Sequence, residues 1–258
     1  MRQELKESLS LASFNALLSG RALLKGLDYF RFIEYVILFQ QFKYLKTGNR
    51  KILDVGCGEE PLGLFMSFKK GYSVYAIDSD PHKISIQSKY LKKLQQKRSL
   101  MYSPAVKDAG QTGFADSFFD SIFCLALLLL LPGDKDKEIM KEIGRIVKPG
   151  GYVFVSLSIG GRYEEVVNDS IAKGFTRVYD EKAIDTRILA PSGLTLVNKI
   201  YFGEQRFSFS RKWYRLPFCL RLPFRWLTPL LSLLFLQFGK TLSHPNGIFL
   251  ILTKNDKE

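Results

Sequence analysis

Short apolar runs that end at an acid or at glycine recur along the first two thirds of this chain. The run 51–55 precedes a Gly-Cys-Gly turn, and the run 74–77 precedes Asp78. Each has the length and the branched residues of a buried strand, whereas the apolar residues after Pro61 can open a helix, since proline is tolerated in a first helical turn. Strand, glycine turn and helix in this order predict the βα unit of a doubly wound α/β fold.

The glycine turn separates two classes of nucleotide-binding protein. In dehydrogenases that bind a dinucleotide, a third glycine lies five residues after the first, so that the helix can approach the pyrophosphate. That position is Pro61 in this chain, and the next glycine is Gly63. The spacing therefore argues against a nicotinamide or flavin dehydrogenase.

Four motifs between residues 50 and 160 resemble, in order, those of the class I S-adenosylmethionine-dependent methyltransferases. They are Asp54-Val55-Gly56-Cys57-Gly58, the run that ends at Asp78, the passage from Asp108-Ala109 to Asp120-Ser121-Ile122, and the helix end Glu142 to Lys148-Pro149-Gly150-Gly151. The resemblance implies a Rossmann-like, mostly parallel seven-stranded sheet with an antiparallel last strand. It also implies S-adenosylmethionine as the cofactor.

The same resemblance implies which residues contact that cofactor. The glycine turn would pass under its methionine half, Asp78 would accept hydrogen bonds from the ribose, and Asp108 would accept one from the adenine amino group. The implied cofactor-binding set is Asp54, Gly56, Cys57, Gly58, Asp78, Ser79, Asp108 and Ala109. Asp78 could instead cap the helix that begins near Pro81. Asp116 and Asp120 are interpreted as turn residues.

One position departs from the family pattern. Glu60 stands where many members have a third glycine. Its side chain would either crowd the methionine half of the cofactor or point to solvent.

Residues 1–49 are predicted to form a helical cap over the cofactor mouth. The positions with helical spacing are Leu24, Leu27, Phe30, Ile33, Glu34 and Ile37. Arg31 and Glu34 are three residues apart, so a solvated ion pair is favoured over a substrate role. The catalytic residue is unknown from sequence; Tyr29, Glu34 and Tyr35 are hypotheses for the base that an oxygen or carbon acceptor would need.

The Rossmann-like core is predicted over residues 50–204. Within it the unbroken apolar run Leu125–Leu131 is too short to span a bilayer and is predicted to be the fourth strand, buried on both faces. The signature [N/D]-P-P-[Y/F] does not follow this run. Its absence argues against an enzyme that methylates the amino groups of nucleic-acid bases.

Residues 205–243 are predicted to form a helical insertion before the last strand and tail at 244–258. No Asp or Glu occurs from Gln205 to Asn255, and basic residues alternate with aromatic ones before a leucine-rich run at 227–238. That run is too short for a transmembrane helix. An anchor on an anionic membrane surface is favoured over a lid or a dimer interface, because basic and aromatic residues beside leucines combine shallow burial with attraction to lipid head groups.

Composition agrees with a single methyltransferase domain over residues 1–258. The net charge of +13 also admits nucleic acid, but a leucine-rich surface makes it the less favoured partner. Three scattered cysteines and two histidines indicate a reducing compartment and no metal site. The sequence therefore predicts a cytoplasmic methyltransferase, peripheral on a membrane, with a lipid-linked, amphipathic or other small-molecule acceptor. A catalytically silent membrane scaffold and an RNA methyltransferase are the alternatives.

Overall fold

The computed structural model describes residues 2–19, 28–45, 50–96, 99–169, 174–205, 209–221 and 227–255. The strands are β1 (Lys51–Val55), β2 (Ser73–Asp78), β3 (Tyr102–Val106), β4 (Phe119–Leu125), β5 (Val147–Ser158), β6 (Glu164–Asp169), β7 (Gly174–Val178), β8 (Thr195–Glu204), β9 (Leu236–Gly239) and β10 (Gly247–Thr253). The helices are α1 (Arg2–Ser19), α3 (Tyr29–Gln40), α4 (Leu62–Lys70), α5 (Pro81–Gln95), α6 (Lys135–Ile146), α7 (Glu181–Ile184), α8 (Ala190–Ser192), α9 (Phe209–Arg215), α10 (Phe218–Arg221) and α11 (Thr228–Phe235). Single turns of 3-10 helix lie at Gln41–Tyr44 and Leu128–Leu130, and a π-helical turn lies at Asp185–Leu189.

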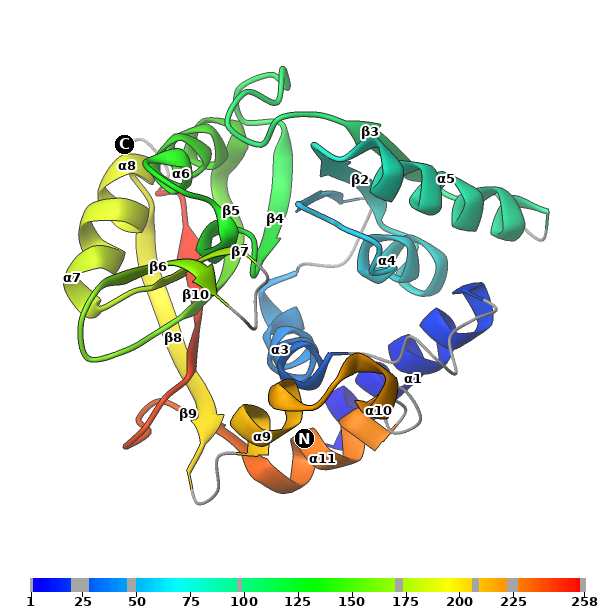
Figure 1. Cartoon of the computed structure of the whole chain (residues 1–258). Coiled ribbons are helices and arrows are strands. Elements are labelled where there is room, and N and C mark those ends of the chain that lie inside the picture. Colours follow the sequence, from blue (N-terminus) through cyan, green and yellow to red (C-terminus); the bar gives the residue numbers. More distant parts are fainter. Residues whose placement is uncertain are drawn as a thin grey trace.

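In the described part of the chain an eight-stranded sheet has the order β3-β2-β1-β4-β5-β10-β8-β9, and β6 and β7 form a separate hairpin (Figure 1). The strands from β3 to β5 are parallel, and β10 runs antiparallel to both of its neighbours. This arrangement confirms the predicted Rossmann-like, mostly parallel sheet with an antiparallel last strand.

Helices cover both faces of the sheet, and successive strand residues face opposite layers. In β1, Ile52 packs in the layer that contains α1, α3, α4 and α5, whereas Leu53 and Val55 pack in the layer of α6. Burial on both sides explains why the core strands read as unbroken apolar runs.

The sheet has one strand more than predicted. The leucine-rich run does not stay helical to its end: α11 stops at Phe235, and β9 then pairs antiparallel with β8, with Leu236 opposite Glu204. The sheet is therefore a seven-stranded core with an added edge strand from the predicted insertion.

The prediction that all of Leu125–Leu131 is the fourth strand is wrong. Strand β4 ends at Leu125, and Ala126 takes a left-handed conformation with φ of 50° while its N–H donates to the Ser156 hydroxyl at 2.8 Å. The next leucines form a 3-10 turn, and Leu128 is fully buried. Leu128 fills the layer beside the end of β4, whereas Leu130 is 45% exposed, so an apolar run at this point does not require a strand.

The N-terminal cap consists of α1 and α3 packed on one face of the sheet. The Asp28 side chain accepts a hydrogen bond from the Phe30 N–H at 3.1 Å and so caps α3. Apart from Phe30, Arg31 and Gln40, the residues of α3 are buried, because α1, α11 and the sheet surround the helix. Leu24 and Leu27 lie outside the described residues.

Candidate functional site

The glycine turn after β1 lies at the carboxyl edge of the sheet and is hydrogen-bonded to β2. Gly56 and Gly58 have φ of +68° and +57°, values that L side chains rarely adopt. The N–H groups of Gly56 and Cys57 both donate to the Ile77 carbonyl, at 2.8 and 3.0 Å. The turn therefore depends on glycine for its shape and on β2 for its position.

Asp78 connects the ends of the first two strands. One carboxylate oxygen accepts from the Gly58 N–H and the other from the Asp80 N–H, both at 3.0 Å. The cap of α5 is Asp80, whose side chain accepts from the His82 N–H at 2.8 Å, so the capping interpretation of Asp78 is wrong. An ionised carboxylate has about four lone-pair sites, which leaves Asp78 capacity for further donors.

The other predicted cofactor residues lie further along the same edge. Val106 is opposite Asp78 in the pairing of β2 with β3, and Asp108 and Ala109 follow β3 directly. Asp108 is exposed and accepts from the Gly110 N–H at 2.6 Å. Ser79 is exposed in the turn after β2. Three neighbouring strands thus end beside one another with the predicted residues at their carboxyl ends.

A small cavity of about 70 Å³ lies directly at the glycine turn. Its lining consists of Arg31, Tyr35, Asp54, Gly56, Cys57, Gly58, Glu60, Leu62 and Leu125. Half of the predicted set lines this cavity, while Asp78, Ser79, Asp108 and Ala109 lie outside it. Of the two orientations considered for Glu60, the one toward the cavity is correct, since its charge also acts on Arg31 and Tyr35.

The cavity brings acids and an arginine together in a buried setting. Burial raises the pKa of Asp54 to about 7, although the nearby Arg31 charge and a hydrogen bond from the Gly63 N–H act in the opposite direction. Asp54 is only 5% exposed. A carboxyl group in this state responds strongly to any cation that enters the cavity.

The prediction of a solvated Arg31–Glu34 pair is wrong. The two groups are 2.8 Å apart, but the Arg31 side chain is 22% exposed and that of Glu34 only 7%. Burial raises the pKa of Glu34, and the Arg31 charge and a hydrogen bond with Ser156 only partly offset this effect. Since Ser156 also accepts from the Ala126 N–H, Glu34 is connected to the backbone at the end of β4.

The three hypothetical bases occupy different surroundings. Tyr35 lines the cavity and is 2% exposed. Tyr29 is fully buried, and its hydroxyl donates to Glu204 at 2.9 Å at the far end of β8. Burial raises the pKa of both tyrosines, so both hydroxyls stay protonated near neutral pH. Glu34 is the one carboxyl group of the three, and it lies next to the cavity through its 2.8 Å contact with Arg31.

Gln87 of α5 is a residue that sequence reasoning missed. Its amide group donates to the carbonyls of Gly58 and Glu60, at 3.0 and 2.9 Å, and its oxygen accepts from the Tyr102 hydroxyl at 2.9 Å. Gln87 is fully buried. Because both N–H groups and the oxygen of this buried amide are hydrogen-bonded, Gln87 holds the glycine turn against α5. A glutamine at an inward position of the helix is the only sequence signal for it.

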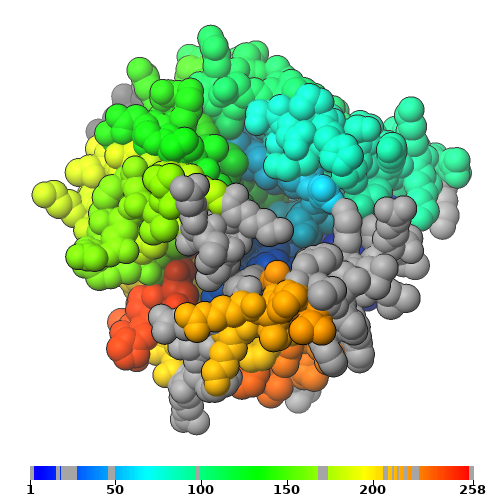
Figure 2. Space-filling view, in the orientation of Figure 1, coloured from blue at the N-terminus to red at the C-terminus, as the bar shows by residue number. Residues whose placement is uncertain are grey.

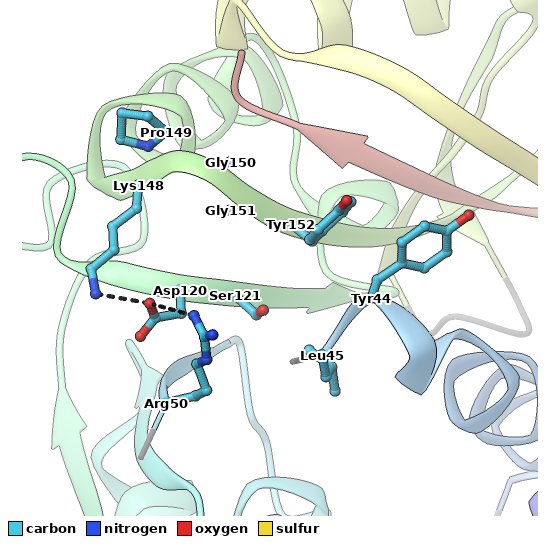
Figure 3. A pocket seen from close by; sticks show the side chains of 10 residues that line it. All are labelled: Tyr44, Leu45, Arg50, Asp120, Ser121, Lys148, Pro149, Gly150, Gly151 and Tyr152. Carbon is cyan, nitrogen blue, oxygen red and sulfur yellow. Dashed lines mark hydrogen bonds and ion pairs between the residues drawn. The ribbon is translucent and has the colours of Figure 1, made fainter. Parts of the chain in front are cut away.

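A second cavity, of about 210 Å³, lies at the opposite edge of the sheet (Figure 3). Asp120, which belongs to β4 rather than to a turn, accepts there from Lys148 at 2.8 Å and from the Lys51 N–H at 2.9 Å, and pairs with Arg50. Burial raises the pKa of Asp120, but these hydrogen bonds outweigh it and hold the pKa below its ordinary value. This cluster joins the starts of β1, β4 and β5, so its role is structural.

The third and fourth sequence motifs also bind each other. Arg145 pairs with Glu142 at 2.8 Å and with Asp116, and Glu142 accepts from the hydroxyl of Thr112 at 2.6 Å. Asp116 lies in a turn, as predicted. The charged residues of the two motifs hold the start of β4 against the end of α6.

A third cavity, of about 690 Å³, lies beyond β5 at the end of β8 and the loop 241–246. It shares no lining residue with the cavity at the glycine turn. Among the residues that the structure describes, no group of His, Cys, Asp and Glu could hold a metal ion. In the same residues no helix is long and apolar enough to cross a membrane.

Comparison with known proteins identifies the family to which this edge of the sheet belongs. Residues 53–155 match a family model described as a methyltransferase domain. That segment contains the glycine turn, Asp78, Asp108 and the interlocked third and fourth motifs. Residues 53–155 are therefore a methyltransferase domain of the class I S-adenosylmethionine-dependent type.

The chain aligns with only part of the length of two curated relatives. The chain is 22% identical to Methyltransferase GfsG of Streptomyces halstedii over 165 residues, 62% of this chain and 58% of that protein. It is 28% identical to Thiol S-methyltransferase TMT1B of Rattus norvegicus over 121 residues, 45% of this chain and 47% of that protein. The chain thus spans about half the length of these relatives.

Solved methyltransferase structures share the fold at low identity. A methyltransferase of Methanosarcina mazei has a TM-score of 0.56 at 20% identity, covering 83% of this chain and 96% of that chain. The 1,6-didemethyltoxoflavin-N1-methyltransferase of Burkholderia thailandensis has a TM-score of 0.56 at 14% identity, covering 99% and 89%. These similarities extend the common fold beyond the matched domain.

The cofactor of this methyltransferase domain is S-adenosylmethionine, and the cavity is compatible with it. A Cβ atom built on Gly58 would meet only the Gly56 carbonyl, at 4.0 Å, so open space lies directly above the turn. The cavity also offers both signs of charge, with Arg31 on one side and Asp54 and Glu60 on the other. An amino-acid zwitterion needs this combination.

Proposed function

We propose that the protein transfers the methyl group of S-adenosylmethionine to a small amphipathic molecule. The observation that carries the proposal is the glycine turn, fixed by Ile77, Asp78 and Gln87, with a cavity of mixed charge directly beside it. Similarity to a thiol methyltransferase and to a small-molecule N-methyltransferase supports an acceptor of this size.

The methionine end of the cofactor is proposed to bind in the cavity. Arg31 would pair with its carboxylate, and Asp54 and Glu60 with its ammonium group, because charge-assisted hydrogen bonds are the strong ones in a buried setting. Asp78 would accept from the ribose hydroxyls and Asp108 from the adenine amino group. Ser79 and Ala109 would line the same groove through their backbone.

The wall of the site toward β4 supports an acceptor with an apolar part. Leu125 lines the cavity, Leu127 packs against Gly56, and Leu130 is 45% exposed. The bound cofactor supplies an activated methyl group, and the protein has to exclude water and align the acceptor with it. Apolar side chains at the end of β4 suit that task. A lipid-linked acceptor is a special case of the same chemistry.

Glu34 is proposed as the group that accepts a proton when the acceptor atom is oxygen or sulfur. It is buried next to the cavity, and its raised pKa makes the ionised form a better proton acceptor than an exposed glutamate. Tyr29 is too remote for this role, since its hydroxyl is bonded to Glu204.

The test of cofactor binding is titration calorimetry with S-adenosylhomocysteine. We expect Asp78→Ala to weaken binding by about 1.5–3 kcal/mol, since charge-assisted acceptors are lost. Arg31→Gln should weaken the binding of S-adenosylhomocysteine but not the binding of methylthioadenosine, which lacks the amino-acid part. Arg50→Gln, at the opposite edge of the sheet, is the matched control. Unchanged affinity in Asp78→Ala would refute the assigned ribose contact.

The test of methyl transfer uses labelled methyl donor with separated lipid, small-molecule, RNA and protein fractions. Label in an organic-soluble small-molecule or lipid fraction, lost in Glu34→Gln, is the expected result. Label in RNA would favour the nucleic-acid alternative. Tight cofactor binding with no labelled fraction would favour a catalytically silent scaffold.

A further inference from the structure

Helix α11 exposes leucines to solvent as well as packing apolar residues inward. Leu231 and Phe235 are partly buried against the core, Thr228 is 1% exposed and Ser232 is fully buried. The Ser232 hydroxyl lies 2.5 Å from the Tyr29 carbonyl and 2.7 Å from the Thr228 carbonyl, which satisfies it inside the protein. The outward face of a surface helix is ordinarily polar.

The outward face of α11 is leucine. Leu230 is 54% exposed, Leu233 40% and Leu234 65%. Two more leucines of the insertion, Leu216 at 42% and Leu220 at 57%, are exposed beside α9 and on α10. We call these five residues the leucine surface. Single exposed leucines need no explanation, but Leu230, Leu233 and Leu234 have the i, i+3, i+4 spacing of one helix face, which indicates a surface that meets an apolar partner.

The charged side chains of the insertion have one sign. Lys212, Arg215 and Lys240 are exposed in the insertion, and no acid occurs between Gln205 and Asn255. An exposed leucine helix with basic residues and no acids complements an anionic membrane surface, where apolar burial and attraction to head groups act together.

The insertion packs against α3, the helix that supplies Arg31 and Tyr35 to the cavity. In Figure 2 its described residues, in orange, lie on the same face as the blue residues in the central hollow, where Figure 1 shows α3. The main chain of Tyr29, two residues before Arg31, is in contact with Ser232 of α11. A membrane against α11 would therefore lie beside α3, which lines the cavity.

We infer that the leucine surface docks the protein on the anionic leaflet of a membrane, with α11 lying in the interface. The inference goes beyond the proposed methyl transfer and does not depend on it. A second copy of the chain is the less suitable occupant, because two such surfaces face to face would bring their basic residues together without acids to pair with them.

The experiment is co-sedimentation with vesicles of phosphatidylcholine alone and with one third phosphatidylglycerol. We expect binding to the anionic vesicles, with part of it retained in 0.5 M NaCl, because the apolar contribution is not screened. Leu230→Gln/Leu233→Gln/Leu234→Gln should weaken binding at least about tenfold, since three apolar side chains no longer enter the lipid. The triple variant should fold normally, as these side chains are exposed.

Two matched controls separate the contributions. Met101→Gln/Val106→Gln/Val197→Gln removes three apolar side chains that are exposed elsewhere, and vesicle binding should not change. Arg215→Gln/Lys240→Gln should weaken binding to the anionic vesicles, while Lys89→Gln/Lys92→Gln on α5 should not. The inference is overturned when the wild type does not sediment with either vesicle, or when the leucine variant binds as well as the wild type.

Oligomeric state is measured on the same samples by light scattering. A wild-type dimer that the leucine variant converts to monomer, with no vesicle binding in either, would assign the surface to contact between copies. Cofactor affinity serves as an independent readout, because it should be equal in the wild type and in the leucine variant whether or not methyl transfer is established.

Discussion

Gly58 combines a left-handed backbone with open space, and this combination distinguishes a binding role from a packing role. Gly56 has a similar φ, but a Cβ there would lie 2.8 Å from a methyl group of Leu127. Packing is therefore part of the reason why this position needs glycine. At Gly58 nothing in the protein lies closer than 4.0 Å to such a Cβ atom. The space is available to a ligand.

We therefore expect Gly58→Ala to reduce cofactor affinity by at least about tenfold while lowering the free energy of unfolding by only about 1–2 kcal/mol, the cost of a left-handed L residue. Gly71→Ala is the control, because its φ is +73° with nothing within 4 Å of a Cβ and it lies at the end of α4. Calorimetry and urea unfolding measure the two effects. Equal loss of affinity in both variants would mean that backbone strain, not a blocked cofactor, is responsible.

Asp54 gives the site a pH dependence near neutrality. Its pKa is raised to about 7 by burial, so the folded protein without ligand holds a proton there below pH 7. A cationic ligand favours the ionised form, and binding must then release that proton. Cofactor affinity should fall as the pH decreases below 7, by up to about tenfold per unit.

The measurement is the dissociation constant of S-adenosylhomocysteine between pH 5.5 and 8. In Asp54→Asn the fall on the acid side should disappear, because no carboxyl remains to titrate. An acid limb that persists unchanged in this variant would assign the titration to another group.

At the scale of the element, the sequence correctly predicted those strands and helix ends that a pattern of a few neighbouring residues specifies. The strands β1 and β2 and the end of α6 carry their signals within a few residues: a branched run, a glycine or acid at the end, and Lys148-Pro149-Gly150. The residues at the strand ends then came together because parallel strands share a carboxyl edge. Strand β9 has no such signal, since it forms by pairing with residues 201–204 of β8, more than thirty residues away.

Two further failures have a common cause. The run after Leu125 is apolar whether it continues a strand or fills a layer, and composition cannot separate these outcomes. Burial of Arg31 and Glu34 depends on α11 and the sheet around α3, which a helical i, i+3 spacing does not reveal. In both cases contacts with residues distant in sequence determine the structure.

Helix α5 supports the site through one side chain, and Gln87→Leu tests this. The variant is close in size but leaves the Gly58 and Glu60 carbonyls and the Tyr102 hydroxyl without their partner. We expect the free energy of unfolding to fall by about 2–4 kcal/mol and cofactor affinity to fall about tenfold, because the glycine turn loses its support.

Tyr102→Phe is the graded control for Gln87, since it removes one of these hydrogen bonds and leaves both bonds to the turn. Its effect on cofactor affinity should be less than threefold by calorimetry, which corresponds to about 0.6 kcal/mol. If Gln87→Leu lowers the free energy of unfolding but leaves cofactor affinity unchanged, Gln87 stabilises the fold without positioning the glycine turn.

At the scale of the whole molecule, Glu204 joins three parts of the chain. Its carboxylate accepts from the Tyr29 hydroxyl of the cap at 2.9 Å, and from the N–H and the hydroxyl of Ser210 in α9, both at 2.7 Å. The residue itself ends β8 and is 9% exposed. The sheet, the cap and the insertion thus meet at one buried acid.

Glu204→Gln should loosen the insertion before it loosens the sheet. The amide nitrogen cannot accept, so one of the three donors loses its partner at a cost of about 1–3 kcal/mol. Glu181→Gln is the matched control: it also removes a carboxylate bonded to a tyrosine and to Lys199, but its side chain is 58% exposed, and we expect less than about 1 kcal/mol. Hydrogen exchange should accelerate in 209–221 and 228–239 and stay unchanged in β1 and β4, because opening a peripheral unit needs less free energy than opening the core. Equal acceleration throughout the sheet would show instead that Glu204 stabilises the fold as a whole, and that the leucine surface and the cofactor site open only together.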